Sequence, residues 1–287
     1  MGDAIESLDL PAWVERAPNG NRHFREAVHT ILHAISTSME LSTKMIMKGG
    51  MLMAIRYDSS RFTRDIDFST RAPYAIGNET ILLNKLDEQL ILANDRFTYD
   101  VMCMRQRSII RPKKPGANFP TLNLSIGYAR QSNPRELSKL LAKQAPTVVE
   151  IDYSYNEAVL DTEILRLANG SSLEVYSQVN LMAEKYRSIL QQPIRKRYRR
   201  QDAYDLFLLL KFHHPLGDHE KSHLLKCLVE SARTREINPK AHSLRDSEIR
   251  TMTSNDYGTL ESDIEGELPP FDEVYQTVQD FYESLPW

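Results

Sequence analysis

Two aspartates, Asp65 and Asp67, stand one residue apart inside the apolar segment "RDIDFST", and this spacing limits what the chain can fold into. Side chains of a β-strand alternate between its two faces, so a strand here points both carboxylates to one side. Ile66 and Phe68 then point to the other side, toward a core. Because two adjacent carboxylates repel each other unless a cation neutralises them, we expect the acidic face of this strand to bind a metal ion.

Magnesium is the natural partner for such a face, because Mg²⁺ prefers carboxylate oxygens and keeps sites for substrate phosphates. Mn²⁺ is the alternative. Two such ions about 3.5–4 Å apart can activate an attacking hydroxyl and stabilise a leaving oxygen. A third carboxylate usually comes from a neighbouring strand, and "TVVEIDYSY" offers Glu150 and Asp152 on one face. We favour Asp152, with Glu150 as the alternative, so the expected metal ligands are Asp65, Asp67 and Asp152.

Two adjacent glycines precede the helical run "GMLMAIRYD", a few residues before the aspartates. Free N–H groups at a helix start and the helix dipole favour phosphate, and a residue without Cβ lets the backbone approach closely. We therefore expect Gly49 and Gly50 to hold a triphosphate, with the nearby cations Lys48 and Arg64 among the nucleotide-binding residues. The simpler interpretations are an ordinary turn and two solvated aspartates.

The composition is that of an ordinary globular protein, with 287 residues, 41% hydrophobic and 26% charged. No apolar run approaches the roughly 20 residues that span a bilayer, and the first 20 residues show no basic region followed by an apolar one. The two cysteines have no zinc or disulfide spacing. We expect a cytoplasmic protein without membrane contact.

The order of the elements predicts an α+β fold. Residues 1–170 read as a nucleotide-binding mixed sheet flanked by helices, with expected helices at 21–41 and 78–95 and strands at 96–105, 120–130 and 146–156. Residues 171–287 read as a helical domain joined to the first near 165–176, with helices at 177–192, 199–214, 218–233 and 271–285. We expect the polar residues 233–270 to form a loop or extended arm.

Charge is unevenly distributed. Residues 251–287 have nine acidic residues and no Lys or Arg, and removing these nine charges from the chain's −3 leaves +6 on residues 1–250. The segment 185–200 has seven basic residues and no acidic one. Such a run is either a solvated face or a surface that contacts phosphates.

Two motifs together resemble a known family. "KGGMLMAIRYDSSRFTRDIDFS" and, about 110 residues further on, "VYSQVNLMAEKYRSILQ…RRQDAYDLFLLL" resemble the signatures of the AbiEii/AbiGii-type nucleotidyltransferase toxins, within the DNA polymerase beta-like nucleotidyltransferase superfamily. The resemblance covers roughly residues 25–212. Many members of the superfamily have Gly-Ser where this chain has Gly49–Gly50, so a hydroxyl contact to phosphate is absent here.

The resemblance implies roles for further residues. Asp65 and Asp67 would hold the metals, Lys185 would contact the nucleotide phosphates, and Asp205 would be a required acid. Arg200 and Asp202 would support that site. The expected catalytic residues are therefore Asp65, Asp67, Lys185 and Asp205.

The function implied is Mg²⁺-dependent transfer of NMP from an NTP to an acceptor hydroxyl, by the toxin of a bacterial toxin–antitoxin or abortive-infection system. The expected partners are the NTP, an RNA acceptor such as a tRNA 3′ end, and an antitoxin encoded nearby. Two alternatives remain open. One is a small-molecule, antibiotic-type nucleotidyltransferase, and the other is a degenerate module that only binds a nucleotide or a partner.

Overall fold

The computed structural model describes residues 7–18, 20–113, 116–213 and 215–287, which group into two compact units. The sheet unit comprises the described residues up to 55, together with 64–157 and 163–175. The helical unit comprises 56–63, 158–162 and the described residues from 176 to 287. The chain therefore makes two short excursions into the helical unit before it stays there.

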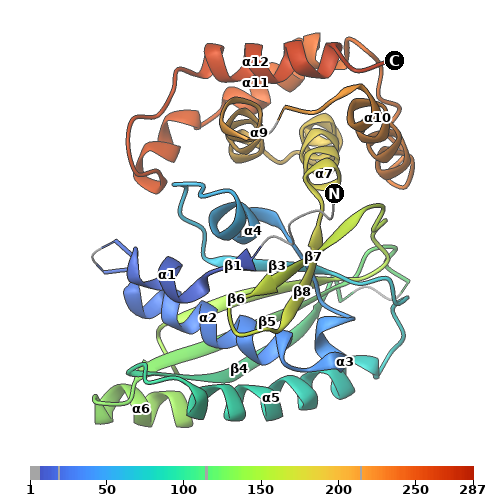
Figure 1. Cartoon of the computed structure of the whole chain (residues 1–287). Helices are drawn as coiled ribbons and strands as arrows, with labels where there is room; N and C mark the ends of the chain where they lie inside the picture. Colours follow the sequence, from blue (N-terminus) through green and yellow to red (C-terminus); the bar gives the residue numbers. More distant parts are fainter. Residues whose placement is uncertain (1–6, 19, 114–115, 214) are drawn as a thin grey trace. The chain divides into compact units, whose positions relative to one another are not determined.

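A mixed sheet forms the centre of the sheet unit (Figure 1). Across the described residues it has eight strands in the order β1-β7-β8-β2-β3-β6-β5-β4. The strands are β1 (Ser7–Leu8), β2 (Ile46–Lys48), β3 (Asp65–Ser69), β4 (Val101–Arg111), β5 (Thr121–Arg130), β6 (Val148–Ser154), β7 (Thr162–Leu167) and β8 (Ser172–Tyr176). β3 is parallel to β6 and antiparallel to β2, while β4, β5 and β6 pair antiparallel in succession.

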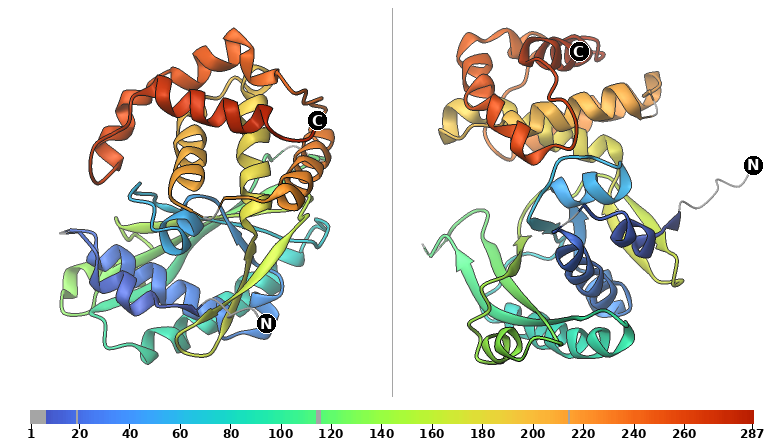
Figure 2. Two further views of the ribbon diagram at one scale, coloured as in Figure 1. Left: turned by 45° about the horizontal axis from the view of Figure 1, so that its top comes forward. Right: turned by 90° about the vertical axis from the view of Figure 1, so that its left-hand side faces the viewer.

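Helices pack against the sheet of this unit (Figure 2). The helices of the unit are α1 (Leu10–Glu15), α2 (Arg22–Ser36), α3 (Met39–Ser42), α4 (Gly49–Arg56), α5 (Asn78–Arg96) and α6 (Pro134–Leu141). α2 packs on β4, β5 and β6 and also on α5. The side chains of Ile66, Phe68 and Ile151 are fully buried. This mixed sheet with flanking helices confirms the predicted α+β class.

The expected elements of the first 160 residues exist, with shifted ends. The helix expected at 21–41 divides into α2 and α3, and the strand expected at 96–105 is β4, which begins at Val101. The segment 165–176 was expected to join two halves, and the chain passes from the sheet unit to the helical unit after Val175, at the end of this segment. It contributes β7 and β8, and β8 pairs in parallel with β2. The division at residue 170 into a catalytic and a helical domain stays a prediction.

The helical unit is built around α7, which lies between α9 and α10 (Figure 1). Its elements are α7 (Gln178–Leu190), α8 (Gln192–Arg195), α9 (Arg200–Phe212), α10 (Asp218–Arg233), α11 (Ser247–Ser254), α12 (Phe271–Glu283) and the 3₁₀ segments η1 (Ser243–Arg245) and η2 (Tyr257–Asp263). The ring centroids of Tyr186 on α7 and Tyr282 on α12 lie 5.3 Å apart. Because both side chains are fully buried, the C-terminal helix is part of this core.

The polar region 233–270 is not an extended arm, so that expectation was wrong. It contains α11, whose Ile249 and Thr253 are buried. The side chain of Gln192 donates to Thr253 Oγ1 at 2.7 Å, which ties α11 to the start of α8. In the described part of the chain, no helix is long and apolar enough to cross a membrane.

The start of α7 offers a test of this packing. Ser177 Oγ accepts from Asn180 N at 3.1 Å and donates to Asp161 Oδ2 at 2.6 Å, so it caps the central helix. Ser177→Ala should lower the free energy of unfolding by about 1–2 kcal/mol, measured by urea titration. Ser222→Ala is the control, because Ser222 Oγ only donates to Asp218 O within α10, and its effect should stay within about 0.5 kcal/mol. Equal effects of the two substitutions would contradict the capping role.

Candidate active site

Four carboxylates share one face of the sheet unit. β3 and β6 run parallel with Asp65 opposite Glu150 and Asp67 opposite Asp152. Along both strands these residues alternate with buried apolar ones, as the period of two requires. The structure therefore brings together the Asp-x-Asp pair and both candidates for the third carboxylate.

Crowding of like charges is visible at Asp65. Partial burial raises the pKa of its carboxyl, and the neighbouring Asp152 and Glu150 raise it further, while Arg64 opposes them. Arg64 itself is exposed at the entry to β3. The ionised form of Asp65 is therefore disfavoured by its surroundings, and a nearby cation would reverse that.

Two polar residues of β5 orient the carboxylates of β6. Asn123 donates from Nδ2 to Asp152 Oδ1, and Ser125 Oγ donates to Glu150 Oε2 at 2.7 Å. Because β5 lies beside β6, each pair is also a cross-strand pair in the register of the sheet. The orientation of both acids is thus set by the sheet.

Gly49 is required at its position for two reasons. Its φ is +73°, which L side chains rarely adopt, and a Cβ there would lie 2.0 Å from Asp67 Oδ2. The Asp67 carboxylate therefore packs directly against the first residue of α4, the helix that Gly49 and Gly50 open as predicted. The glycine that we expected to admit a phosphate thus makes room for the carboxylate that we expected to bind a metal ion.

Lys48, which we expected to bind nucleotide, forms an ion pair with Glu157. Lys48 is buried, and its Nζ forms an ion pair with Glu157 Oε2. Ser69 Oγ donates to the same oxygen at 2.9 Å. Glu157 therefore links Lys48, which precedes the two glycines, to Ser69, the last residue of the Asp-x-Asp strand β3.

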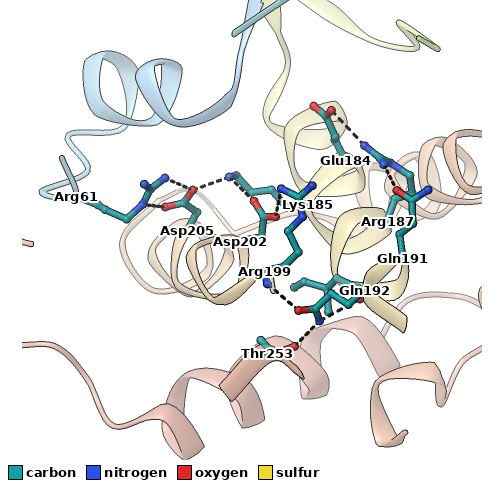
Figure 3. A network of polar contacts seen from close by, with 11 residues as sticks. Arg61, Glu184, Lys185, Arg187, Gln191, Gln192, Arg199, Asp202, Asp205 and Thr253 are labelled. Carbon is teal, nitrogen blue, oxygen red and sulfur yellow. Dashed lines mark hydrogen bonds and ion pairs between the residues drawn. The ribbon is translucent and has the colours of Figure 1, made fainter. Parts of the chain in front are cut away.

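The second group of predicted residues lies in the helical unit (Figure 3). Lys185 Nζ of α7 lies 2.6 Å from Asp205 Oδ2 and 3.3 Å from Asp202 Oδ1, both on α9. Arg61 donates to Asp205 with two parallel bonds, Nε to Oδ1 and Nη2 to Oδ2, each 2.9 Å. Two cations and two carboxylates thus form one network.

Burial and charge oppose each other in this network. Burial of Asp205, whose side chain is 0% exposed, favours its neutral form. Arg61 and Lys185 nevertheless hold the pKa of Asp205 at about 2, and Asp205 with Asp202 raises the pKa of the buried Lys185 ammonium. Arg61, Lys185 and Asp205 are therefore charged at neutral pH.

Arg200, expected to support the site, is the first residue of α9 and is partly exposed. The arginine that approaches Asp202 is Arg199, whose Nη1 lies 3.8 Å from Asp202 Oδ2. The expected residues therefore fall into two groups. One is in the sheet unit (Lys48, Gly49, Gly50, Arg64, Asp65, Asp67, Asp152) and the other in the helical unit (Lys185, Arg200, Asp202, Asp205).

The described residues contain no group of three or more His, Cys, Asp and Glu side chains placed so that together they could hold a metal ion. The donor set on β3 and β6 still fits a divalent cation of the magnesium type. Such an ion uses one or two protein carboxylates and completes its shell with water and substrate phosphates, so a protein-only cage is not required. The raised pKa of Asp65 marks where a positive charge is favoured.

Sequence reasoning missed four residues of the two groups: Arg61, Asn123, Ser125 and Glu157. Asn123 and Ser125 could have been found, because "TLNLSIGYAR" alternates polar and apolar residues and lies next to the strand with Glu150 and Asp152. Arg61 and Glu157 show no such local signal. Their partners lie 144 and 109 residues away.

The contact between Gly49 and Asp67 can be measured. Gly49→Ala should lower the free energy of unfolding by several kcal/mol, because the Cβ adds a steric overlap to a backbone strain of about 1–2 kcal/mol. Gly170→Ala is the matched control, since its φ of +85° is similar and nothing lies within 4 Å of a Cβ there.

The double variant Gly49→Ala/Asp67→Ala removes the carboxylate but leaves the Cβ of residue 67 at 2.9 Å from the added methyl group, so it should recover part of the stability lost in Gly49→Ala. If Gly49→Ala and Gly170→Ala cost the same, the close approach of Asp67 is not present in solution.

Comparisons with known proteins support the fold. A Helicobacter pylori protein provisionally named a nucleotidyltransferase superposes with a TM-score of 0.53 at 14% identity, over 94% of this chain and 95% of that one. JHP933 from Helicobacter pylori gives the same TM-score and identity, over 93% and 92%. Among curated proteins, no sequence matches the chain.

The comparison with families identifies the chain more closely. The profile described as "Nucleotidyl transferase AbiEii toxin, Type IV TA system" matches residues 31–277, which is most of the chain and includes both groups of polar residues. The match therefore extends past the two motifs that suggested the family, into the C-terminal helices. The chain belongs to the AbiEii nucleotidyltransferase toxin family of type IV toxin–antitoxin systems.

Proposed function

We propose that this nucleotidyltransferase toxin moves NMP from an NTP to an acceptor hydroxyl on RNA and releases pyrophosphate, using Mg²⁺ or Mn²⁺. The observation that carries this proposal is the register of β3 and β6, which aligns Asp65 with Glu150 and Asp67 with Asp152 on one face. A cation-binding acidic face next to a helix start suits a reaction in which a hydroxyl oxygen attacks the α-phosphorus of an NTP and the bond to pyrophosphate breaks.

The residues of the sheet unit divide the work. Asp65, Asp67 and Asp152 would hold the divalent ions, which supply charge neutralisation and Lewis acidity at the α-phosphate when bound. The backbone N–H groups of Gly49 and Gly50 would bind the triphosphate at the start of α4. Asn123 would fix the Asp152 carboxylate through its hydrogen bond.

Lys48 and Arg64 would contribute differently from one another. Because Lys48 Nζ is paired with Glu157, its role is to fix the peptide that leads into Gly49. Arg64 is exposed next to Asp65, where its charge favours phosphate. In the helical unit, Lys185, Asp202, Asp205 and Arg200 remain the proposed supporting residues, with a direct phosphate contact of Lys185 as a prediction.

An RNA acceptor is supported by a basic surface on the helical unit. Arg195, Lys196 and Arg197 are exposed, next to Tyr198, which is 48% exposed. Exposed cations with an aromatic ring among them suit single-stranded RNA, because the cations contact phosphates and the ring stacks on a base. A tRNA 3′ end is one such strand.

The acidic C-terminal residues do not neutralise that surface through any ion pair among the described residues. Glu273 pairs with Lys211, Asp272 pairs with Arg250, and Glu283 pairs with Arg245 and His242. Lys196 pairs instead with Glu248, which precedes the acidic stretch. The basic surface thus keeps most of its charge.

The biological setting follows from the family. Membership of a type IV toxin–antitoxin family implies an antitoxin partner. We further propose that the toxin acts in the cytoplasm, that its antitoxin is encoded nearby, and that residues 1–170 form the catalytic domain and 171–287 the helical one.

Removal of a metal-site carboxylate tests the reaction. Asp67→Asn and Asp65→Asn keep the side-chain shape but weaken cation binding, so transfer of radiolabelled NMP to total RNA should fall by about 10²–10³. Asp95→Asn, at an exposed position of α5, is the control and should leave the rate within twofold. Wild-type turnover in Asp67→Asn, with unchanged thermal stability, would refute the assignment.

Salt dependence tests the acceptor. Replacing Arg195, Lys196 and Arg197 by Ala should weaken RNA binding. It should also reduce the log–log salt slope by about 2–3 units, because fewer phosphate contacts form and fewer counterions are released on binding. The matched control replaces Arg135, Lys139 and Lys143, three exposed cations on and after α6, and changes the net charge equally. If both triple variants behave alike, the basic surface is not the RNA contact.

A further inference from the structure

Arg61 belongs to the loop between the Gly-Gly helix α4 and the Asp-x-Asp strand β3. Residues 56–63 connect α4 to β3, yet they belong to the helical unit, whereas the chain on both sides belongs to the sheet unit. This loop therefore leaves the sheet unit just after the Gly-Gly helix and returns just before Asp65. The loop is therefore the covalent connection between the Gly-Gly helix and the Asp-x-Asp strand.

The loop is attached to the helical unit by its backbone as well as by Arg61. Phe62 N donates to Asp263 O at 2.6 Å, and Arg61 forms an isolated antiparallel bridge with Ile264. At the other end of the loop, Tyr57 O lies 3.1 Å from His213 Nε2. These contacts guide the loop along the helical unit, and the guanidinium of Arg61 enters its interior.

The clamp between Arg61 and Asp205 is strong by its geometry and its surroundings. The two parallel bonds of 2.9 Å match the fork of a guanidinium to a carboxylate, an arrangement that one ammonium group cannot reproduce. The side chains of Arg61 and Asp205 are 11% and 0% exposed, so water does not compete with the pair. Removing Arg61 would leave the buried Asp205 carboxylate with Lys185 as its ion-pair partner, while Asp202 keeps both Lys185 and Arg199.

We propose that Arg61 is a positioning residue for nucleotidyl transfer. By clamping Asp205, it fixes the loop whose end carries Asp65 and Asp67, so the buried network of Arg61, Lys185, Asp202 and Asp205 acts on the reaction through the loop. Asp65 follows Arg61 by four positions, a span of roughly 14 Å at most. If the side chain of Arg61 is not held, the loop can move, and this motion can displace the Asp65 carboxylate. Small displacements of a catalytic group slow a reaction steeply.

The proposal rests on the proposed function for its kinetic readout, but it also has a structural readout that needs no turnover. Hydrogen exchange should show faster exchange of the amides of residues 57–64 in Arg61→Ala than in the wild type. The amides of α7 and α9 should stay protected, because Lys185 still pairs with the acids of α9. Loss of protection throughout α7 and α9 would mean that Arg61 only stabilises the helical unit, and would overturn the proposal.

The kinetic readout separates positioning from substrate contact. In Arg61→Ala the kcat for NMP transfer should fall about 10²-fold while the KM for NTP stays within about threefold. Guanidinium ion at low millimolar concentration should restore at least tenfold of the lost kcat, because it can occupy the vacated place on Asp205. A raised KM with unchanged kcat would place Arg61 on the substrate instead, and unchanged kcat and KM would remove it from the reaction.

Two further variants complete the experiment. Arg61→Lys keeps the charge but not the fork, so it should fold, lose about tenfold in kcat and show faster exchange at 57–64. This variant decides the proposal if Arg61→Ala does not fold. Arg71→Ala is the control, because Arg71 pairs with Glu174 at 2.6 Å and is half exposed. It should change neither kcat nor loop exchange and should not respond to guanidinium.

If the wild type transfers no nucleotide, the proposed function fails, yet hydrogen exchange still tests the anchoring. Unchanged exchange at 57–64 in both Arg61 variants would refute the anchoring whatever the activity.

Discussion

Repulsion between carboxylates on two parallel strands is the constraint that organises the sheet unit. The register of β3 and β6 aligns Asp65 with Glu150 and Asp67 with Asp152, so no change of side-chain rotamer separates them fully. The surrounding residues support this arrangement. Ser125 and Asn123 hold the acids of β6 by hydrogen bonds, and Gly49 gives Asp67 a place that any side chain would fill.

The parts of the site that sequence could predict are those set by local periodicity. The alternation in "RDIDFST" and "TVVEIDYSY" was sufficient to place four carboxylates on one face, because the period of a strand is fixed by its backbone. The same holds for the Gly-Gly start of α4. Each of these features involves residues within a few positions of one another.

The parts that sequence could not predict depend on distant partners or on weak patterns. Arg61 and Asp205 are 144 residues apart, and nothing in "SSRFTRD" distinguishes Arg61 from Arg64, which we selected instead. The region 233–270 was read as an arm because α11 has few apolar residues. It is stable because Ile249 and Thr253 are buried and Gln192 reaches Thr253. β7 and β8 were missed because each is a short strand with exposed or half-buried positions.

The two groups of charged residues differ in how their charges are balanced, and this difference indicates how each can act. In the network of the helical unit, the formal charges of two cations and two acids cancel. Asp205 accepts hydrogen bonds from both Lys185 and Arg61. The predicted contact of Lys185 with a substrate phosphate would therefore require its buried ion pair with Asp205 to open, which is costly. On the sheet, the neighbouring carboxylates of Asp152 and Glu150 raise the pKa of Asp65. A cation bound there would reduce this repulsion and stabilise the ionised form of Asp65. The sheet is therefore suited to bind and react, and the network is suited to hold.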